Sequence, residues 1–222
     1  MWGTQLGGYL EGFCVKISRL YAIVDVDTLR VSGCRVRSFG EELRRAGVRL
    51  VQYRNKNGTA ADALRDASIL REVFAGTGTT LLMNDRADLA VLAGWDGVHV
   101  GQGDLAPADA RMVAGPGCVV GVSTHLECEV EAANESCADY VAIGPVFATG
   151  TKADAAPVVG LDGVRRARAL TGKPLVAIGG ITRANARSVI DAGADSVAVI
   201  SGLLAKGERP GRIAEEFLER LR

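Results

Sequence analysis

From residue 20 onward the chain repeats one pattern of hydrophobic and polar positions. A short apolar run rich in Val and Ile is followed by a polar or Gly-containing loop and then by an amphipathic stretch. This pattern predicts alternating strands and helices. Eight strands are expected at 20–25, 49–54, 79–85, 96–101, 118–123, 138–145, 174–180 and 195–202. Helices are expected near 36–47, 59–75, 86–94, 107–115, 126–136, 161–171, 183–192 and 210–221.

The arrangement of these elements predicts the fold class. The apolar runs do not alternate with polar residues, which is typical of a parallel sheet that is covered by helices. Eight similar βα units without interruption favour a closed barrel over an open doubly wound sheet. We therefore expect an α/β protein with one compact (β/α)8 TIM barrel over residues 19–222, preceded by a loosely attached extension over 1–18. The longest irregular connection, about 146–160, is a candidate functional loop.

Local signals support the helix boundaries. Thr59 and Thr182 are plausible N-caps, and Pro107 and Pro210 suit a first helical turn. Glycines stand where three helices should end, at Gly47, Gly94 and Gly193.

Charge and cysteine content narrow the class of protein. Lys+Arg (26) balances Asp+Glu (26) and the sequence pI is about 6.7, so no overall field attracts nucleic acid or an anionic membrane. The five cysteines show no Cys-x-x-Cys spacing, which indicates reduced thiols and a cytoplasmic location. Neither a signal peptide nor a membrane span is evident in the sequence. A homo-oligomer is compatible with the sequence, which does not set the number of subunits.

Active sites of such barrels lie at the carboxyl ends of the strands, and these ends are rich in polar residues. The last two strands end in Gly179-Gly180-Ile181 and in Ser201-Gly202, where such barrels bind phosphate through backbone N–H groups. A tight turn into the next helix is the alternative explanation for the glycine pair. The neighbouring Ser-Gly favours the phosphate site.

A second set of charged residues follows other strand ends. It comprises the cations and amide Arg54, Lys56, Asn84 and Lys152, and the acids Asp85 and Asp104. The cations suit a diphosphate, and two carboxylates without histidine neighbours suit Mg²⁺. Ordinary salt bridges between these cations and acids are the alternative, but they do not explain why the charges follow consecutive strands.

The sequence contains none of the motifs that are typical of zinc enzymes, Walker-type nucleotide hydrolases or serine hydrolases. The chain has only two histidines and no zinc-type spacing, no Walker loop and no nucleophile elbow. His99 stands in mid-strand and is expected to be a packed structural residue. For His125, which follows Ser123 at a strand end, a loop-orienting role and a catalytic role remain equally open.

Six segments, in order over about 20–205, resemble the thiamine phosphate synthase family. They are "VQYRNK", "NDRADLAVLAGWDGVHVGQGDL", "GVSTH", "ADYVAIGPVFATGTK", "AIGGIT" and "GADSVAVISG". The chain departs from the family pattern at Tyr53, Asn55 and Ala148, none of which is a proposed ligand.

The resemblance implies a reaction and its ligands. A pyrimidine-methyl group would pass from its diphosphate ester to the ring nitrogen of a thiazole phosphate, releasing pyrophosphate by a dissociative route that Mg²⁺ assists. Carried over by position, the diphosphate substrate is held by Gln52, Arg54, Lys56, Asn84, Ser123 and Lys152, with Arg54, Ser123 and Lys152 as catalytic groups. Asp85 and Asp104 are the implied metal ligands, and the thiazole phosphate is held by Thr149, Thr151, Gly179, Ile200 and Ser201.

Three other functions share this barrel or its phosphate site. A thiazole tautomerase would tend to lose the metal and diphosphate residues, which this sequence keeps. A sugar phosphate isomerase or epimerase would need a catalytic acid, base or metal-histidine pair in the barrel centre, and none is evident. A non-catalytic thiazole phosphate-binding regulator stays open, although the intact metal acids argue against it.

Overall fold

The computed structural model describes residues 17–150 and 157–222. Most of the expected extension, and the candidate site residues Thr151 and Lys152, lie outside the described residues.

Eight parallel strands close into a barrel in the order of the sequence. They are β1 (Leu20–Asp25), β2 (Leu50–Arg54), β3 (Thr80–Asn84), β4 (Gly97–Val100), β5 (Val119–Thr124), β6 (Tyr140–Ile143), β7 (Leu175–Ile178) and β8 (Ser196–Val199). Because β1 pairs with both β2 and β8, the sheet has no free edge. The prediction of a single (β/α)8 barrel is confirmed.

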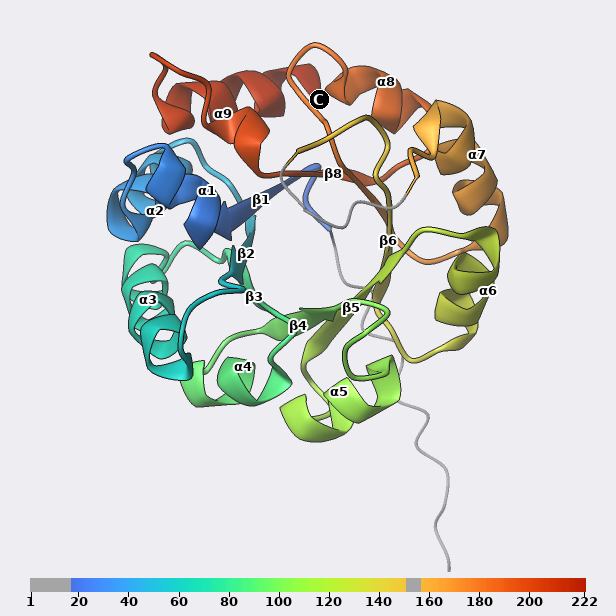
Figure 1. Cartoon of the computed structure of the whole chain (residues 1–222), viewed down its shortest axis with the longest axis horizontal. Helices are drawn as coiled ribbons and strands as arrows, with labels where there is room; N and C mark the ends of the chain where they lie inside the picture. Colours follow the sequence, from blue (N-terminus) through green and yellow to red (C-terminus); the bar gives the residue numbers. More distant parts are fainter. Residues whose placement is uncertain (1–16, 151–156) are drawn as a thin grey trace, which may run out of the picture.

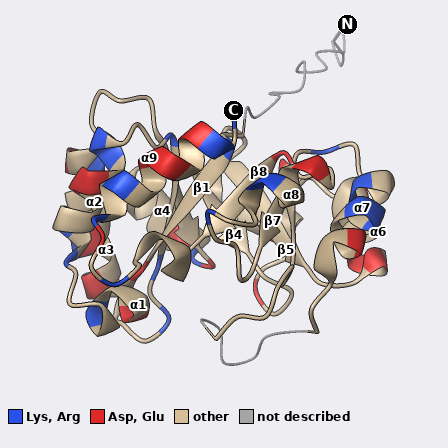
Figure 2. Cartoon of the chain, turned by 90° about the horizontal axis from the view of Figure 1, so that it is seen from above, with Lys and Arg blue, Asp and Glu red and all other residues tan. Residues whose placement is uncertain are grey.

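Helices surround the strands as an outer ring (Figure 1). They are α2 (Val36–Arg45), α3 (Ala60–Val73), α4 (Ala87–Ala93), α5 (Pro107–Ala114), α6 (Glu127–Glu135), α7 (Gly160–Leu170), α8 (Ala186–Asp191) and α9 (Pro210–Arg220). Acidic and basic residues are interspersed on these helices (Figure 2), which agrees with the balanced net charge. No helix in the described part of the chain is long and apolar enough to cross a membrane.

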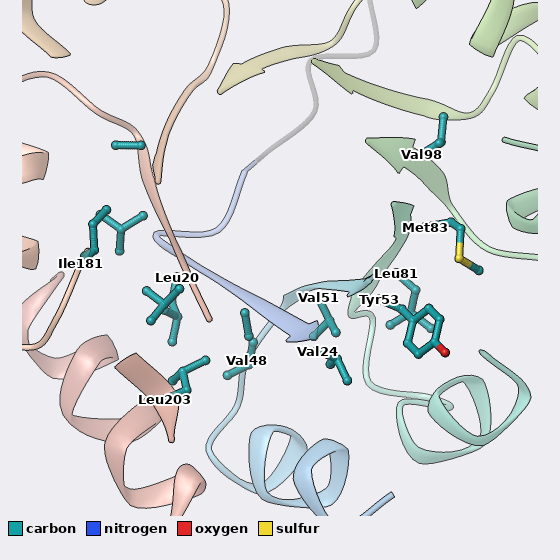
Figure 3. Packing of buried hydrophobic residues seen from close by; sticks show 14 of the residues in the cluster. Leu20, Val24, Val48, Val51, Tyr53, Leu81, Met83, Val98, Ile181 and Leu203 are labelled. Carbon is teal, nitrogen blue, oxygen red and sulfur yellow. The ribbon is translucent and has the colours of Figure 1, made fainter. Parts of the chain in front are cut away.

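Each strand buries both of its faces, which explains the continuous apolar runs. Leu20 and Val24 of β1 point outward and pack in the layer between the sheet and the helices (Figure 3). Tyr21 and Ile23, at the alternate positions, belong to a second cluster inside the barrel. Successive side chains of a strand point to opposite faces, so a strand of this barrel needs an apolar residue at nearly every position.

The structure confirms most of the predicted helix boundaries and corrects one. Thr59 caps α3, and Pro107 and Pro210 occupy first turns. Thr182 is not an N-cap, because α8 begins only at Ala186. The backbone N–H of Thr182 instead donates to the side chain of Asn185 at 2.7 Å, within a turn that precedes the helix. The glycines expected after α2, α4 and α8 all have positive φ: Gly47, Gly94 and Gly193.

A short helix, α1 (Val26–Val31), was not expected from the sequence. Asp25 ends β1 and caps this helix, with Oδ1 accepting from the backbone N–H of Thr28 at 2.9 Å and from its hydroxyl at 2.6 Å. Six residues are too few to show a helical period, although an Asp three positions before a Thr is a recognisable cap signal. A 3₁₀ turn, η1 (Ser201–Leu203), also follows β8 within the predicted strand 195–202.

Replacing Thr59 by Ala should lower the free energy of unfolding by about 1 kcal/mol. The Thr59 hydroxyl accepts from the backbone N–H of Asp62 and donates to its carboxylate, which holds the pKa of Asp62 at about 2. A carboxylate with a lowered pKa adds stability above its unfolded value of 3.8 that is lost as the pH falls toward 2. The difference from wild type in urea unfolding should therefore shrink between these pH values. Thr59→Ser should restore stability; an unchanged midpoint for Thr59→Ala would contradict the cap.

Candidate functional site

The carboxyl ends of the strands open into two adjoining cavities. The larger has a volume of about 970 Å³ and lies against the ends of β1 to β5, with walls that also reach β6, β7 and β8. The smaller, of about 140 Å³, lies at the ends of β5 to β8. Seven residues line both cavities: Ser123, His125, Ala142, Ile178, Ala198, Ile200 and Ser201. A ligand in one cavity would therefore touch the same wall as a ligand in the other.

The large cavity collects most of the charged candidates from separate strands. Its lining includes Gln52, Arg54, Lys56, Asn84, Asp85, Asp104 and Ser123. The barrel register explains the grouping, because Asp25 of β1 is the partner of Arg54 and Asn84 of β3 is the partner of His99. Gln52 and Ser123, which are 71 positions apart in sequence, thus share one cavity because parallel strands end at the same level.

Both cations of this cavity have carboxylate partners. Arg54 Nη1 donates to Asp25 Oδ2 at 2.5 Å, and both side chains are largely buried. Lys56 Nζ contacts Asp85 Oδ2, and its side chain is 47% exposed. The Lys56 contact is the salt bridge that the sequence left open as an alternative. Arg54 pairs with a different acid, Asp25, at the end of β1.

Asp85 and Asp104 lie close together at the mouth of the large cavity. Burial raises the pKa of Asp85, and the neighbouring Asp104 carboxyl raises it further, against the opposing effect of Lys56. Asp104 Oδ2 accepts the backbone N–H of Gly101 at 2.8 Å. Two adjacent carboxylates that resist carrying two charges are suited to a bound cation. Within residues 17–150 and 157–222 no group of three or more His, Cys, Asp or Glu side chains could hold a metal, so ligand phosphate and water would have to complete its coordination.

Asp85 has an unusual backbone conformation. Its φ of 61° is the only positive value of a non-glycine residue in the described part of the chain. The backbone N–H of Asp85 donates to the carbonyl of His99 at 2.7 Å, which anchors this turn to β4. Left-handed backbone at a bulky or charged residue is uncommon and concentrates at functional sites.

The small cavity combines glycine-containing turns with apolar side chains. Gly179, Gly180, Ser201 and Gly202 line it, together with Ile200 and Thr149. Gly179 and Gly180 have φ values of 103° and 63°. A Cβ on Gly180 would lie 2.6 Å from the carbonyl oxygen of Ala148, so this glycine lets the loop after β6 pass close to β7. The positive φ values fit a tight turn after β7, and the same two glycines line the cavity, so the phosphate site stays a prediction.

Both histidines line the large cavity together with Ser123. His99 is 8% exposed, stacks on Tyr140 and accepts or donates hydrogen bonds at both ring nitrogens, which confirms that it is a packed residue. It also lines the large cavity. His125 Nδ1 lies 2.5 Å from the carbonyl oxygen of Gly144. This contact supports the loop-orienting role of His125, because Gly144 begins the loop after β6.

Other cavity residues had no clear signal in the sequence. Tyr21, Asp27, Thr28 and Asn57 line the large cavity, and Asn57 donates to Asp27 at 2.8 Å across the cavity rim. Tyr21 could have been found from the alternation within β1, since it shares a face with Ile23 and Asp25. The contact between residues 27 and 57 depends on the unexpected helix α1 and could not be found in this way.

Known proteins resemble this chain over most of its length. The family model described as thiamine monophosphate synthase matches residues 20–203. A thiamine-phosphate synthase of Koribacter versatilis is 54% identical over 207 residues, covering 92% of this chain and 96% of that protein. One of Chloroflexus aurantiacus is 43% identical over 84% of this chain and 85% of its own length.

A solved structure agrees with these sequence relatives. Thiamine phosphate pyrophosphorylase from Pyrococcus furiosus has a TM-score of 0.80 at 31% identity, covering 91% of this chain and 95% of its own. The family match over residues 20–203 includes every strand of the barrel and the residues that line both cavities. The chain belongs to the thiamine monophosphate synthase family.

Proposed function

We propose that the two cavities hold the two substrates of thiamine phosphate synthesis, with the pyrimidine diphosphate in the large cavity and the thiazole phosphate in the small one. Thiamine-phosphate synthase activity, a group transfer, is the activity of the family. The observation that carries the residue-level proposal is the shared wall. Ser123 lines both cavities, so the bond that breaks and the bond that forms can lie beside the same hydroxyl.

The large cavity suits a diphosphate with its metal. Arg54, Lys56 and Asn84 supply donors, and Lys152 is the further cation expected from the sequence. Asp85 and Asp104 would hold Mg²⁺, since hard carboxylate oxygens without histidine or cysteine neighbours fit this ion. When bound, Mg²⁺ supplies positive charge that stabilises the departing pyrophosphate. Lys56 would then exchange its Asp85 partner for a phosphate oxygen.

The small cavity suits the acceptor phosphate. Thr149, Gly179, Ile200 and Ser201 line this cavity and would hold the phosphate through backbone N–H groups and a hydroxyl. Thr151 is the further ligand expected from the sequence. Backbone N–H groups at glycine-rich turns bind phosphate without any net charge on the protein, which suits a chain whose net charge is zero.

The reaction needs charge stabilisation and no proton transfer. The C–O bond between the pyrimidine methylene and the diphosphate breaks, and its electron pair leaves with pyrophosphate. The thiazole nitrogen then donates its lone pair to the methylene carbon, and the positive charge ends on the thiazolium ring. The Gln52 amide would orient the pyrimidine, and the cavity walls would exclude water from the reactive cation. This explains a site in which neither histidine is placed as a general base.

The free cysteines support a cytoplasmic location for the enzyme. No disulfide is formed among the cysteines of the described segments, Cys34, Cys118, Cys128 and Cys137, as expected for a cytoplasmic enzyme.

Purified protein should form thiamine phosphate and pyrophosphate from the aminopyrimidine diphosphate and the thiazole phosphate, and should require Mg²⁺. Chromatography of the products with and without EDTA checks this. Lys152→Ala should abolish product formation, whereas Lys206→Ala, at a residue that lines neither cavity, should not. Binding of the thiazole phosphate without product formation would instead support the tautomerase or the regulator.

A further inference from the structure

We propose that His99 is a positioning residue, which directs the hydroxyl hydrogen of Ser123 into the substrate cavity, and that a one-way chain of hydrogen bonds sets the tautomer of His99. The part that concerns Ser123 rests on the proposed function. The tautomer of His99 does not, and it can be measured without any substrate.

The chain of hydrogen bonds crosses the interior of the barrel. Gln52 Nε2 lies 2.7 Å from the Tyr21 hydroxyl, which lies 3.0 Å from the Tyr140 hydroxyl. The Tyr140 hydroxyl lies 2.8 Å from His99 Nδ1, and His99 Nε2 lies 2.8 Å from Ser123 Oγ. Gln52, Tyr21, Tyr140 and His99 are each less than a tenth exposed, so water cannot easily replace a member of the chain.

The Gln52 amide determines the direction of the chain. An amide nitrogen can only donate, so the Tyr21 oxygen accepts from Gln52. Among the described hydrogen-bond partners of the Tyr21 hydroxyl, the Tyr140 oxygen is the one that can accept its hydrogen, so we infer that Tyr21 donates to Tyr140 and that Tyr140 donates to His99 Nδ1. A neutral imidazole that accepts at Nδ1 carries its hydrogen on Nε2. His99 therefore donates to Ser123.

This direction controls what Ser123 offers to a ligand. Its Oγ accepts from His99, so its own hydrogen is directed away from His99, on the side where Ser123 lines the two cavities. The carbonyl oxygen of Ser123 accepts from Gln102 Nε2 at 2.7 Å, which holds the backbone. Phosphate oxygens are acceptors, so a hydroxyl that donates stabilises them. In the reversed chain Ser123 would donate to His99 and would present only lone pairs to the anion.

Packing holds Tyr140 where the chain requires it. Its ring stacks on His99, with centroids 5.5 Å apart and an angle of 21° between the planes. The ring also covers Gly121, where a Cβ would lie 1.9 Å from the ring. Tyr140 is fully buried and lines neither cavity. A change of its hydroxyl can therefore reach a substrate only through its hydrogen-bonded neighbours.

The tautomer can be read from a long-range ¹H–¹⁵N correlation spectrum of the imidazoles, recorded above the ordinary histidine pKa of about 6.5. The chain has two histidines, and they should differ. His125 Nδ1 faces the carbonyl oxygen of Gly144, an acceptor, so His125 carries its hydrogen on Nδ1. His99 should carry its hydrogen on Nε2, and the variant His125→Asn assigns the signals. A hydrogen on Nδ1 of His99 would overturn the proposal, whatever the activity of the protein.

Activity provides a second, independent test. Tyr140→Phe removes the hydrogen directed at Nδ1, and should convert His99 partly to the other tautomer in the same spectrum. It should lower kcat about tenfold while the KM for the thiazole phosphate stays unchanged, since a net hydrogen bond to a charged group is of this size.

A matched control separates this effect from a loss of stability. Tyr53 is equally buried but lies outside the cavities, with its hydroxyl donating to Asp66 at 2.8 Å. Tyr53→Phe should reduce the free energy of unfolding without lowering kcat. If Tyr140→Phe keeps the wild-type kcat, or if Tyr53→Phe loses as much, the positioning role of His99 is wrong.

Discussion

Asp85→Asn should lower the rate of thiamine phosphate formation by at least about a hundredfold, the usual loss when one preorganised electrostatic group is removed. It should also raise the Mg²⁺ concentration needed for half-maximal rate. Asp85 and Asp104 are adjacent carboxylates at the mouth of the large cavity, and the amide that replaces one of them carries no charge for the cation. Initial rates over a series of Mg²⁺ concentrations measure both effects.

Asn is the appropriate replacement because of the backbone at this position. Asp85 has a φ of 61°, which Asn adopts more readily than Ala. Burial and Asp104 raise the pKa of Asp85, so its charge does not stabilise the fold at neutral pH. The variant should therefore unfold at a temperature no lower than wild type.

Asp88→Asn is the matched control for this change. Asp88 lies three positions away on the surface and pairs with Arg86, a type of ion pair that contributes about 0–1 kcal/mol. It should keep wild-type activity and the wild-type Mg²⁺ response. An Asp85→Asn enzyme with the wild-type rate and the wild-type Mg²⁺ response would contradict the metal assignment.

Arg54→Lys should raise the KM for the pyrimidine diphosphate about tenfold or more, because lysine cannot make the planar bidentate contact of a guanidinium. The KM for the thiazole phosphate should change little, since Arg54 lines the large cavity and not the small one. Steady-state kinetics with each substrate varied in turn distinguish the two cavities. An equal rise in both values would contradict the separate placement of the substrates.

Asp25 is expected to act on the same substrate through Arg54. Its Oδ2 accepts from Arg54, while its Oδ1 caps α1. Asp25→Asn keeps an oxygen for the cap but removes the charge that orients the guanidinium, so the KM for the diphosphate should rise by less than in Arg54→Lys. Arg37→Lys, which weakens a similar pair with Glu72 on the surface, is the control and should leave both values unchanged.

Much of the candidate site could be predicted from the order of strand ends alone. In a parallel barrel all strands end at one level, so Arg54, Asn84, Asp85, Asp104 and Ser123 had to meet there once the strands were recognised. The structure places all five on the large cavity. Their roles as ligands stay predictions.

Other features depended on partners that sequence patterns do not identify. The sequence suggested Asp85 or Asp104 as possible partners of Arg54, whereas the structure pairs it with Asp25. That pairing follows from the register of β1 and β2. Thr182 resembled an N-cap, but the helix begins at Ala186 because the turn before it satisfies the Thr182 backbone through Asn185. The general preference of Thr for the N-cap position is outweighed here by these competing side-chain to backbone hydrogen bonds.

The sequence by itself determined the closed barrel, the order of its strands and the face on which the polar residues gather. These properties follow from periodicities and turn residues that act within about twenty positions along the chain. Only the tertiary structure decided which polar atoms meet. Tyr21 and Tyr140 are 119 positions apart and share a hydrogen bond inside the barrel, because closure of the sheet brings their inward faces to the same depth. The hydrogen-bond chain from Gln52 to Ser123, on which the proposed tautomer of His99 depends, exists because of that closure and not because of a local feature of the sequence.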